Sequence, residues 1–138
     1  MKLLSFQAKR FAWRSHSKTL ASASNERVDE SVADAAVVFV HAEAKDVSVE
    51  ERERVFRHAL KHVKWLAGKR DSKNVVLHSF THLGAESAPP EFAEAFLQDL
   101  AARLRGTGYS VRTTPFGWFC EWDLSVHGES MAKVWKEI

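Results

Sequence analysis

Apolar and polar positions along this chain form short segments with two different periods. The continuous apolar runs 35–42 (AAVVFVHA) and 74–78 (NVVLH) are too short for helices and rich in β-branched side chains, as buried strands are. Residues 2–8 and 109–113 form two further runs typical of strands. In 118–126, apolar residues alternate with polar ones, which predicts a strand with one buried face. The pattern therefore predicts about five strands.

Two longer segments have the period of an amphipathic helix. Ser48 and Glu51 match a capping box, and apolar residues then recur at helical spacing as far as Leu66. Pro90 begins a second segment of this kind, and Gly106 is placed to end it. We expect both helices to cover the sheet, which makes the chain a single α/β domain.

Three other stretches have less regular patterns. Residues 14–25 are mostly Ser, Lys, His and Ala without a period, which favours an irregular loop. The turn 114–117 (TPFG) is expected to reverse the chain between the fourth and fifth strands. Apolar residues between 131 and 138 recur at i, i+3, i+4 and i+7, which predicts a final helix.

Composition narrows the class of protein. The chain has 138 residues, 45% of them hydrophobic, which fits one domain with one core over 1–138. A net charge of +2 is too small to indicate a nucleic-acid partner. The single cysteine, Cys120, excludes an internal disulfide, and the start MKLLSFQAKR lacks the apolar stretch of a secretory signal, so we expect a cytoplasmic protein. No segment approaches the roughly 18 consecutive apolar residues of a membrane span.

Two histidines have the spacing of some zinc ligands. His58 and His62 lie four residues apart on the first predicted helix and share one face. No third ligand is evident, and Lys61 and Lys64 lie beside them. We therefore predict a solvated basic face with no metal and no cofactor.

Residue types of nucleophilic hydrolases also occur. Cys120 with His82 as base would be the pair that cysteine hydrolases use. The face of its strand is otherwise Trp, Leu and Val, which favours a cysteine in a core or pocket wall. Ser79, His82 and Glu86 have the types of a catalytic triad, but the sequence motif of a nucleophile elbow is absent.

Two segments at strand ends are better candidates for a site. Residues 80–83 (FTHL) follow a buried strand, and residues 115–119 (PFGWF) lead into the last long strand. If they converge, they line one cleft. On pattern alone the second segment is equally compatible with a hairpin turn packed by its own phenylalanine.

The order of several segments resembles a known family. The start MKLL, the aromatic residues Phe11 and Trp13, and the segments HSFTHLGAESAPP and TTPFGWFCEWDLSVHG match in order and spacing. They are similar to the N-terminal editing domain of archaeal threonyl-tRNA synthetases, whose fold is that of D-aminoacyl-tRNA deacylases. The two later segments are specific to the family, and the resemblance spans nearly the whole chain.

The resemblance implies a proofreading hydrolase. Serine lacks one methyl of threonine, and lost apolar contact alone rejects the smaller amino acid by only about 10–200-fold. In the family, seryl-tRNA meant to carry threonine is hydrolysed in a pocket too small for that methyl. The implied partners are the acceptor end of the transfer RNA, a catalytic synthetase domain or subunit, and a second copy of the chain in a homodimer.

The resemblance also implies roles for individual residues. His82 matches the active-site histidine, and Phe119 lies where the family more often has tyrosine. Cys120 replaces a lysine near the scissile bond, and Lys133 replaces a glutamate. Residues that shape the pocket or offer backbone groups to the substrate are Ala42, Phe80, Thr81, Phe116, Gly117 and Trp118.

The two replacements leave three mechanisms open. In the one we favour, backbone groups and the terminal ribose hydroxyl of the transfer RNA orient a water molecule. In the second, Lys133 reaches back from the final helix to supply the missing ammonium group. In the third, the domain has lost hydrolysis and serves as a binding or assembly module.

Other functions stay open beside this one. A D-aminoacyl-tRNA deacylase would have the same fold but would recognise chirality. An RNA-binding module would need a basic stripe, to which Lys9, Arg10, Arg14 and Lys18 could contribute, although a solvated face explains these charges as well. The end at Ile138, without a polar tail, leads us to expect the N-terminal part of a longer chain.

Overall fold

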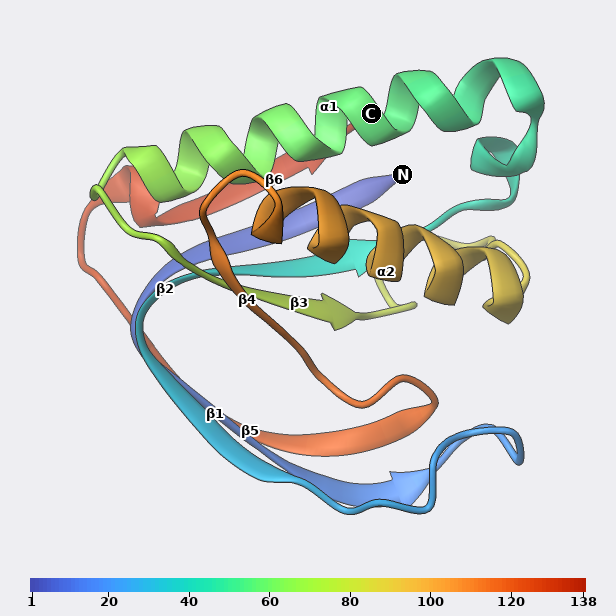
Figure 1. Ribbon diagram of the computed structural model, residues 1–138, viewed down its shortest axis with the longest axis horizontal. Helices are drawn as coiled ribbons and strands as arrows, with labels where there is room; N and C mark the ends of the chain where they lie inside the picture. The colour runs from blue at the N-terminus through green and yellow to red at the C-terminus, as the bar shows by residue number, and fades with distance from the viewer.

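The chain forms six strands, two α-helices and two short 3₁₀ helices. The computed structural model describes residues 1–138 throughout (Figure 1). The elements in chain order are β1 (Lys2–Lys18), β2 (Asp29–His41), η1 (Ala44–Val47), α1 (Val49–Gly68), β3 (Asn74–Ser79), α2 (Pro90–Arg105), β4 (Ser110–Thr113), β5 (Trp118–Val126), η2 (Ser130–Ala132) and β6 (Lys133–Glu137).

All strands belong to one sheet of order β4-β3-β2-β1-β5, with β6 also paired to β1. The strands β2, β3 and β4 are parallel to one another, because α1 and α2 provide the crossovers between them. β1 is antiparallel to β2, β5 and β6. The sheet curls strongly, so that β5 and the far halves of β1 and β2 lie away from the helices in Figure 1.

Both helices cover the same face of the sheet. Ser48 caps α1 by accepting a hydrogen bond from the backbone N–H of Glu51 at 3.3 Å, and Pro90 and Gly106 bound α2 as the sequence predicts. The apolar sides of α1 and α2 form the main core with the strands β2, β3 and β4. The expected α/β domain with two covering helices is confirmed, and neither helix is long and apolar enough to cross a membrane.

A second core fills the inside of the curl, on the other face of the sheet. Its largest members are Phe11, Trp13 and Phe39, and the rings of Phe11 and Trp13 stack at 5.4 Å. Both faces of β2 are therefore buried, which explains why its sequence is a continuous apolar run.

The prediction of an irregular loop over 14–25 is wrong in its first part. β1 continues to Lys18, where Arg14 pairs with Asp29 of β2 and Lys18 pairs with Trp118 of β5. The polar side chains of this part point mostly to solvent, while the backbone finds strand partners on both sides. Backbone pairing over long sequence distances has no local signal in the sequence.

The prediction of a final helix is also wrong. Residues 133–137 form β6, in which Trp135 pairs with Leu4 and Val134 with Ser5. Val134 packs against the main core, whereas Trp135 remains 50% exposed. A single turn or two of helix is marginal without neighbours, and the first half of β1 has an open edge that β6 satisfies.

Candidate functional site

A cavity of about 510 Å³ lies at the carboxyl ends of the parallel strands β2, β3 and β4. Ala42 follows β2, residues 78–82 end β3 and begin the next loop, and Pro90 and Ala93 come from the start of α2. The far wall is made by residues 115–120. In sheets of this kind, ligands bind where the loops leave the carboxyl ends of parallel strands.

This cavity brings together nearly all of the site residues inferred from the sequence. Those that line it are Ala42, Phe80, Thr81, His82, Phe116, Gly117, Trp118, Phe119 and Cys120. Lys133 does not line it: the side chain is exposed on β6, and its Nζ donates to the carbonyl of His127 at 3.2 Å. The helix from which Lys133 was expected to reach back is absent.

The turn at Gly117 closes one wall of the cavity. It is not a hairpin turn, because β4 and β5 lie at opposite ends of the sheet order and the connection crosses between them. Gly117 has a φ of 76° and accepts a hydrogen bond from Thr19 N at 2.8 Å. A Cβ atom here would lie 2.9 Å from the Cβ of Ala23 and 3.1 Å from that of Leu20. Only glycine fits this close approach without strain.

Aromatic rings form the floor of the cavity. Phe80 lies 5.6 Å from Trp122 and 5.2 Å from His82, measured between ring centroids. His82 is exposed and its imidazole makes no hydrogen bond to another residue. These aromatic rings can therefore pack against a flat apolar group such as a nucleobase.

His78 is a cavity residue that the sequence interpretation missed. Its Nδ1 lies 2.7 Å from the hydroxyl of Thr114, and its ring contacts that of Trp122 at 5.2 Å. Burial lowers the pKa of His78 to about 4, so the imidazole is neutral near pH 7. His78 closes the apolar run NVVLH, and its place at the carboxyl end of a parallel strand was the available signal.

The lining contains no Lys, Arg, Asp or Glu side chain. Burial raises the pKa of the Cys120 thiol, so this group is protonated near pH 7. An activated cysteine needs nearby positive charge, which this lining does not supply. The lining of the cavity is therefore neutral and largely apolar, with a few polar groups.

Ser87 and His41 form a hydrogen-bonded pair of side chains that the sequence analysis also missed. Ser87 lines the cavity, and its Oγ lies 2.9 Å from Nε2 of His41, the last residue of β2. His41 is fully buried, and its Nδ1 has no hydrogen-bond partner. The two residues are 46 positions apart, so their spacing in the sequence does not predict that they are in contact.

Charged groups of Glu43, Lys2 and the Met1 amino group act on His41. The amino group of Met1 bonds the carboxylates of Glu43 at 2.7 Å and Asp46 at 2.9 Å. Burial would raise the pKa of Glu43, but the bonds from Met1, Lys2 and Lys45 lower it to about 2. Glu43 is therefore ionised at every pH of interest.

The histidine pair on α1 is not the solvated face that we predicted. His62 is buried with its Nε2 2.9 Å from Ser5 Oγ, and only His58 is exposed. Burial, with a contribution from Lys136, lowers the pKa of His62 to about 4. The chain contains no group of three His, Cys, Asp or Glu side chains that could hold a metal ion.

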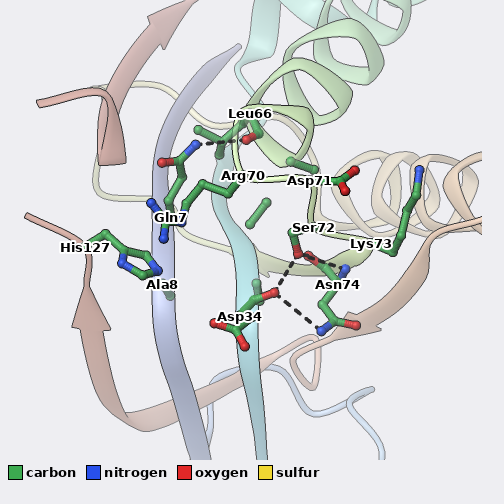
Figure 2. Close-up of a pocket in the computed structure, with 13 residues that line it drawn as sticks. Gln7, Ala8, Asp34, Leu66, Arg70, Asp71, Ser72, Lys73, Asn74 and His127 are labelled. Atoms are coloured by element: carbon green, nitrogen blue, oxygen red, sulfur yellow. Dashed lines mark hydrogen bonds between the residues drawn. The ribbon is translucent and has the colours of Figure 1, made fainter. Parts of the chain in front are cut away.

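A second cavity, of about 370 Å³, lies at the opposite end of the parallel strands (Figure 2). Three of its polar side chains bond backbone carbonyls: Gln7 Nε2 donates to Leu66 O at 3.0 Å, and Ser72 Oγ donates to Asp34 O at 2.6 Å. Asn74 Nδ2 donates to two backbone carbonyls, one of them that of Asp34. These contacts hold the loop after α1 to the sheet, so the three side chains have a structural role.

Comparison with known proteins points to one family. The model of the "Archaea-specific editing domain of threonyl-tRNA synthetase" matches residues 1–138. A threonine–tRNA ligase of Hyperthermus butylicus is 30% identical over 97% of this chain, and one of Methanoregula boonei is 28% identical over 100% of it. The chain spans 22% of the length of each of these two relatives.

A solved structure has the same fold. The "c-Myc DNA Unwinding Element Binding Protein" superposes with a TM-score of 0.66 at 17% sequence identity, and the match covers 100% of this chain and 99% of that one. Similarity at this level of identity concerns the arrangement of the sheet and helices alone.

Proposed function

Because this chain belongs to the archaea-specific editing domains of threonyl-tRNA synthetase, we propose that it removes serine wrongly attached to the transfer RNA for threonine. The reaction is hydrolysis of the ester between serine and the terminal adenosine. The observation that carries the proposal is the neutral, aromatic-walled cavity at the carboxyl ends of the parallel strands. Its volume of about 510 Å³ is in the range of sites for ligands of this size.

Two walls of the cavity support discrimination by size. Ala42 is 94% buried at the end of β2, and Gly117 is held by the backbone of Thr19. A rigid wall rejects an added methyl at a cost of about 1–3 kcal/mol. This corresponds to roughly 5–150-fold slower hydrolysis of the threonyl ester.

A water molecule is the nucleophile in this proposal. The cavity holds no charged side chain, and Cys120 is a protonated thiol where the family resemblance leads us to expect lysine. Backbone groups of the 115–117 turn and the free hydroxyl of the terminal ribose then orient the water against the ester carbonyl. His82 and Phe119 line the same cavity and are exposed, and in this proposal they contact the adenosine.

The partners follow from the same proposal. The chain receives the acceptor end of the transfer RNA from a catalytic synthetase domain or subunit, and it works as a homodimer in the cytoplasm. Size-exclusion chromatography with light scattering measures the oligomeric state directly.

The test compares two substrates. Purified protein should release serine from seryl-tRNA for threonine about 5–150-fold faster than threonine from the matched threonyl-tRNA. The substitution Ala42→Val, which narrows the pocket, should slow serine release as well. Equal cleavage of both esters would contradict proofreading by size, and faster cleavage of a D-aminoacyl ester would assign a chirality-checking deacylase.

A modified substrate tests the water mechanism. Seryl-tRNA that ends in the deoxy analogue lacks the ribose hydroxyl next to the ester and should be hydrolysed far more slowly. Full activity on this substrate would mean that a side chain, and not the ribose hydroxyl, orients the attacking water. Binding of transfer RNA with no hydrolysis of any ester would instead assign a binding or assembly module.

A further inference from the structure

The cavity has a polar contact that no part of the proposed mechanism uses. Ser87 lines the cavity, and its Oγ lies 2.9 Å from Nε2 of His41, which is inaccessible to solvent. A hydroxyl held against a neutral imidazole is the arrangement by which hydrolases remove a proton from a reacting group. Ser87 is itself exposed, so its hydrogen bond to a buried histidine is not needed to satisfy the hydroxyl.

The surroundings of His41 suit a base that is neutral at rest. Burial lowers the pKa of His41, and the charges of Lys2 and the Met1 amino group act in the same direction. The ionised Glu43 and the backbone of Glu86 act in the opposite direction, because they favour the protonated imidazole. His41 is therefore neutral near pH 7, and Glu43 and the backbone of Glu86 offset part of the cost of forming the imidazolium when the ring accepts a proton. This role requires the tautomer in which Nε2 accepts a hydrogen bond from the Ser87 hydroxyl.

We propose that Ser87 and His41 form a proton relay for the attacking water of the deacylation reaction. This inference rests on the proposed function, and it names the groups that take the proton. Ser87 is the catalytic residue, since it faces the substrate. His41 acts through Ser87.

The relay conserves atoms and charge at each step. As the water oxygen forms its bond to the ester carbonyl carbon, one water proton passes to Ser87 Oγ and the Ser87 proton passes to His41 Nε2. When the carbon–oxygen bond to the ribose breaks, the proton returns from His41 through Ser87 to the leaving ribose oxygen. Free serine leaves with its carboxyl group, which loses its proton to solvent.

The other titratable groups of the cavity are less suited to this task. Nδ1 of His78 is held by Thr114, and its pKa of about 4 makes the imidazole a weak base. The thiol of Cys120 is protonated, since burial raises its pKa. No side chain orients the imidazole of His82 by a hydrogen bond.

The experiment measures kcat and KM for seryl-tRNA from pH 5 to pH 8. Ser87→Ala should lower kcat about 100-fold with little change in KM, since general-base catalysis contributes about 10²–10⁴-fold. The unaltered protein should lose activity on the acidic side, below the usual pKa of histidine, and Ser87→Ala should lack this pH dependence. Ser87→Thr retains a hydroxyl and should recover most of the rate. Ser110→Ala, at an exposed serine outside the cavity, is the matched control.

A second pair of variants separates a relay from a structural contact. His41→Gln keeps a polar group beside Ser87 but cannot accept a proton at neutral pH, so it should match Ser87→Ala. The double variant should be no slower than either single one, because the two residues act as a unit. Additive losses, an unchanged kcat in Ser87→Ala, or a serine ester trapped on Ser87 would each overturn the relay.

One measurement does not depend on activity. Nitrogen NMR of His41 should report a change at Nε2 when Ser87 becomes alanine, and an unchanged signal would refute the pair. Failure of the unaltered protein to release serine, by contrast, would refute the proposed function itself.

Discussion

The two cavities at opposite ends of the parallel strands differ in what their polar groups contact. At the amino end, the side chains of Gln7, Ser72 and Asn74 all bond backbone carbonyls of neighbouring elements (Figure 2). At the carboxyl end, the imidazole of His82 is unpaired, and Ser87 lines the cavity with its hydroxyl bonded to another side chain, that of His41. At the amino end these three side chains serve to hold neighbouring backbone in place, whereas the unpaired imidazole of His82 at the carboxyl end is available to a ligand.

The difference follows from the direction of the strands. The amino end receives the tight loop between α1 and β3, which must satisfy its backbone over a short distance. The carboxyl end receives the long segment 80–89 together with the short turn 114–117, and both hold side chains over a shared space. Variants that obstruct the carboxyl-end cavity should therefore change activity, and variants that remove the amino-end hydrogen bonds should change stability.

Acidification should have the largest effect, because it acts on buried histidines. The pKa values of His62 and His78 are both lowered to about 4, so the unfolded chain binds more protons than the folded one below pH 6.5. Stability is complete above this pH and falls as the pH decreases towards 4. Each histidine should contribute a loss of about 2 kcal/mol between pH 7 and pH 5. Urea unfolding at pH 7 and at pH 5 measures this loss of stability. His78→Gln should reduce the loss to about half.

Obstruction of the cavity should have the next largest effect. Gly117→Val puts a β-branched residue at a φ of 76°, where its Cβ would meet Ala23 and Leu20. Strain of this kind costs about 1–3 kcal/mol, and the displaced turn should lower kcat/KM for seryl-tRNA by about 5–150-fold. Normal activity in a folded variant would mean that this turn is not part of the site.

At the amino end, the change should appear in stability. Ser72→Ala removes the hydrogen bond to Asp34 O and should lower the free energy of unfolding by about 1 kcal/mol. The deacylation rate of the folded variant should not change. A loss of activity with unaltered stability would mean that the amino-end cavity takes part in the reaction, which would contradict the distinction between the two cavities.

The smallest effect is expected at Cys120, which lines the carboxyl-end cavity. Cys120→Ala removes one sulfur from a half-buried position and should change kcat/KM by less than about threefold, because water attacks the ester in the proposed mechanism. A loss of several orders of magnitude, with an acyl group trapped on the unaltered protein, would make Cys120 the nucleophile instead.

Much of this protein is determined by local sequence pattern. The apolar runs at 35–42 and 74–78 are strands, and the capped amphipathic segments are the two helices, because burial of one face leaves a clear period. The segments FTHL and PFGWF do meet around one cavity, as expected for loops at the ends of parallel strands.

Only the tertiary structure decided the rest. The polar half of β1 and the strand β6 exist because distant backbone partners satisfy them, and no local period records those partners. His78 meets Thr114 and His41 meets Ser87 across 36 and 46 positions, and such contacts depend on how the sheet curls and where α2 begins. A side chain acquires its hydrogen-bond partner and its pKa from neighbours in space, and the sequence orders neighbours only along the chain.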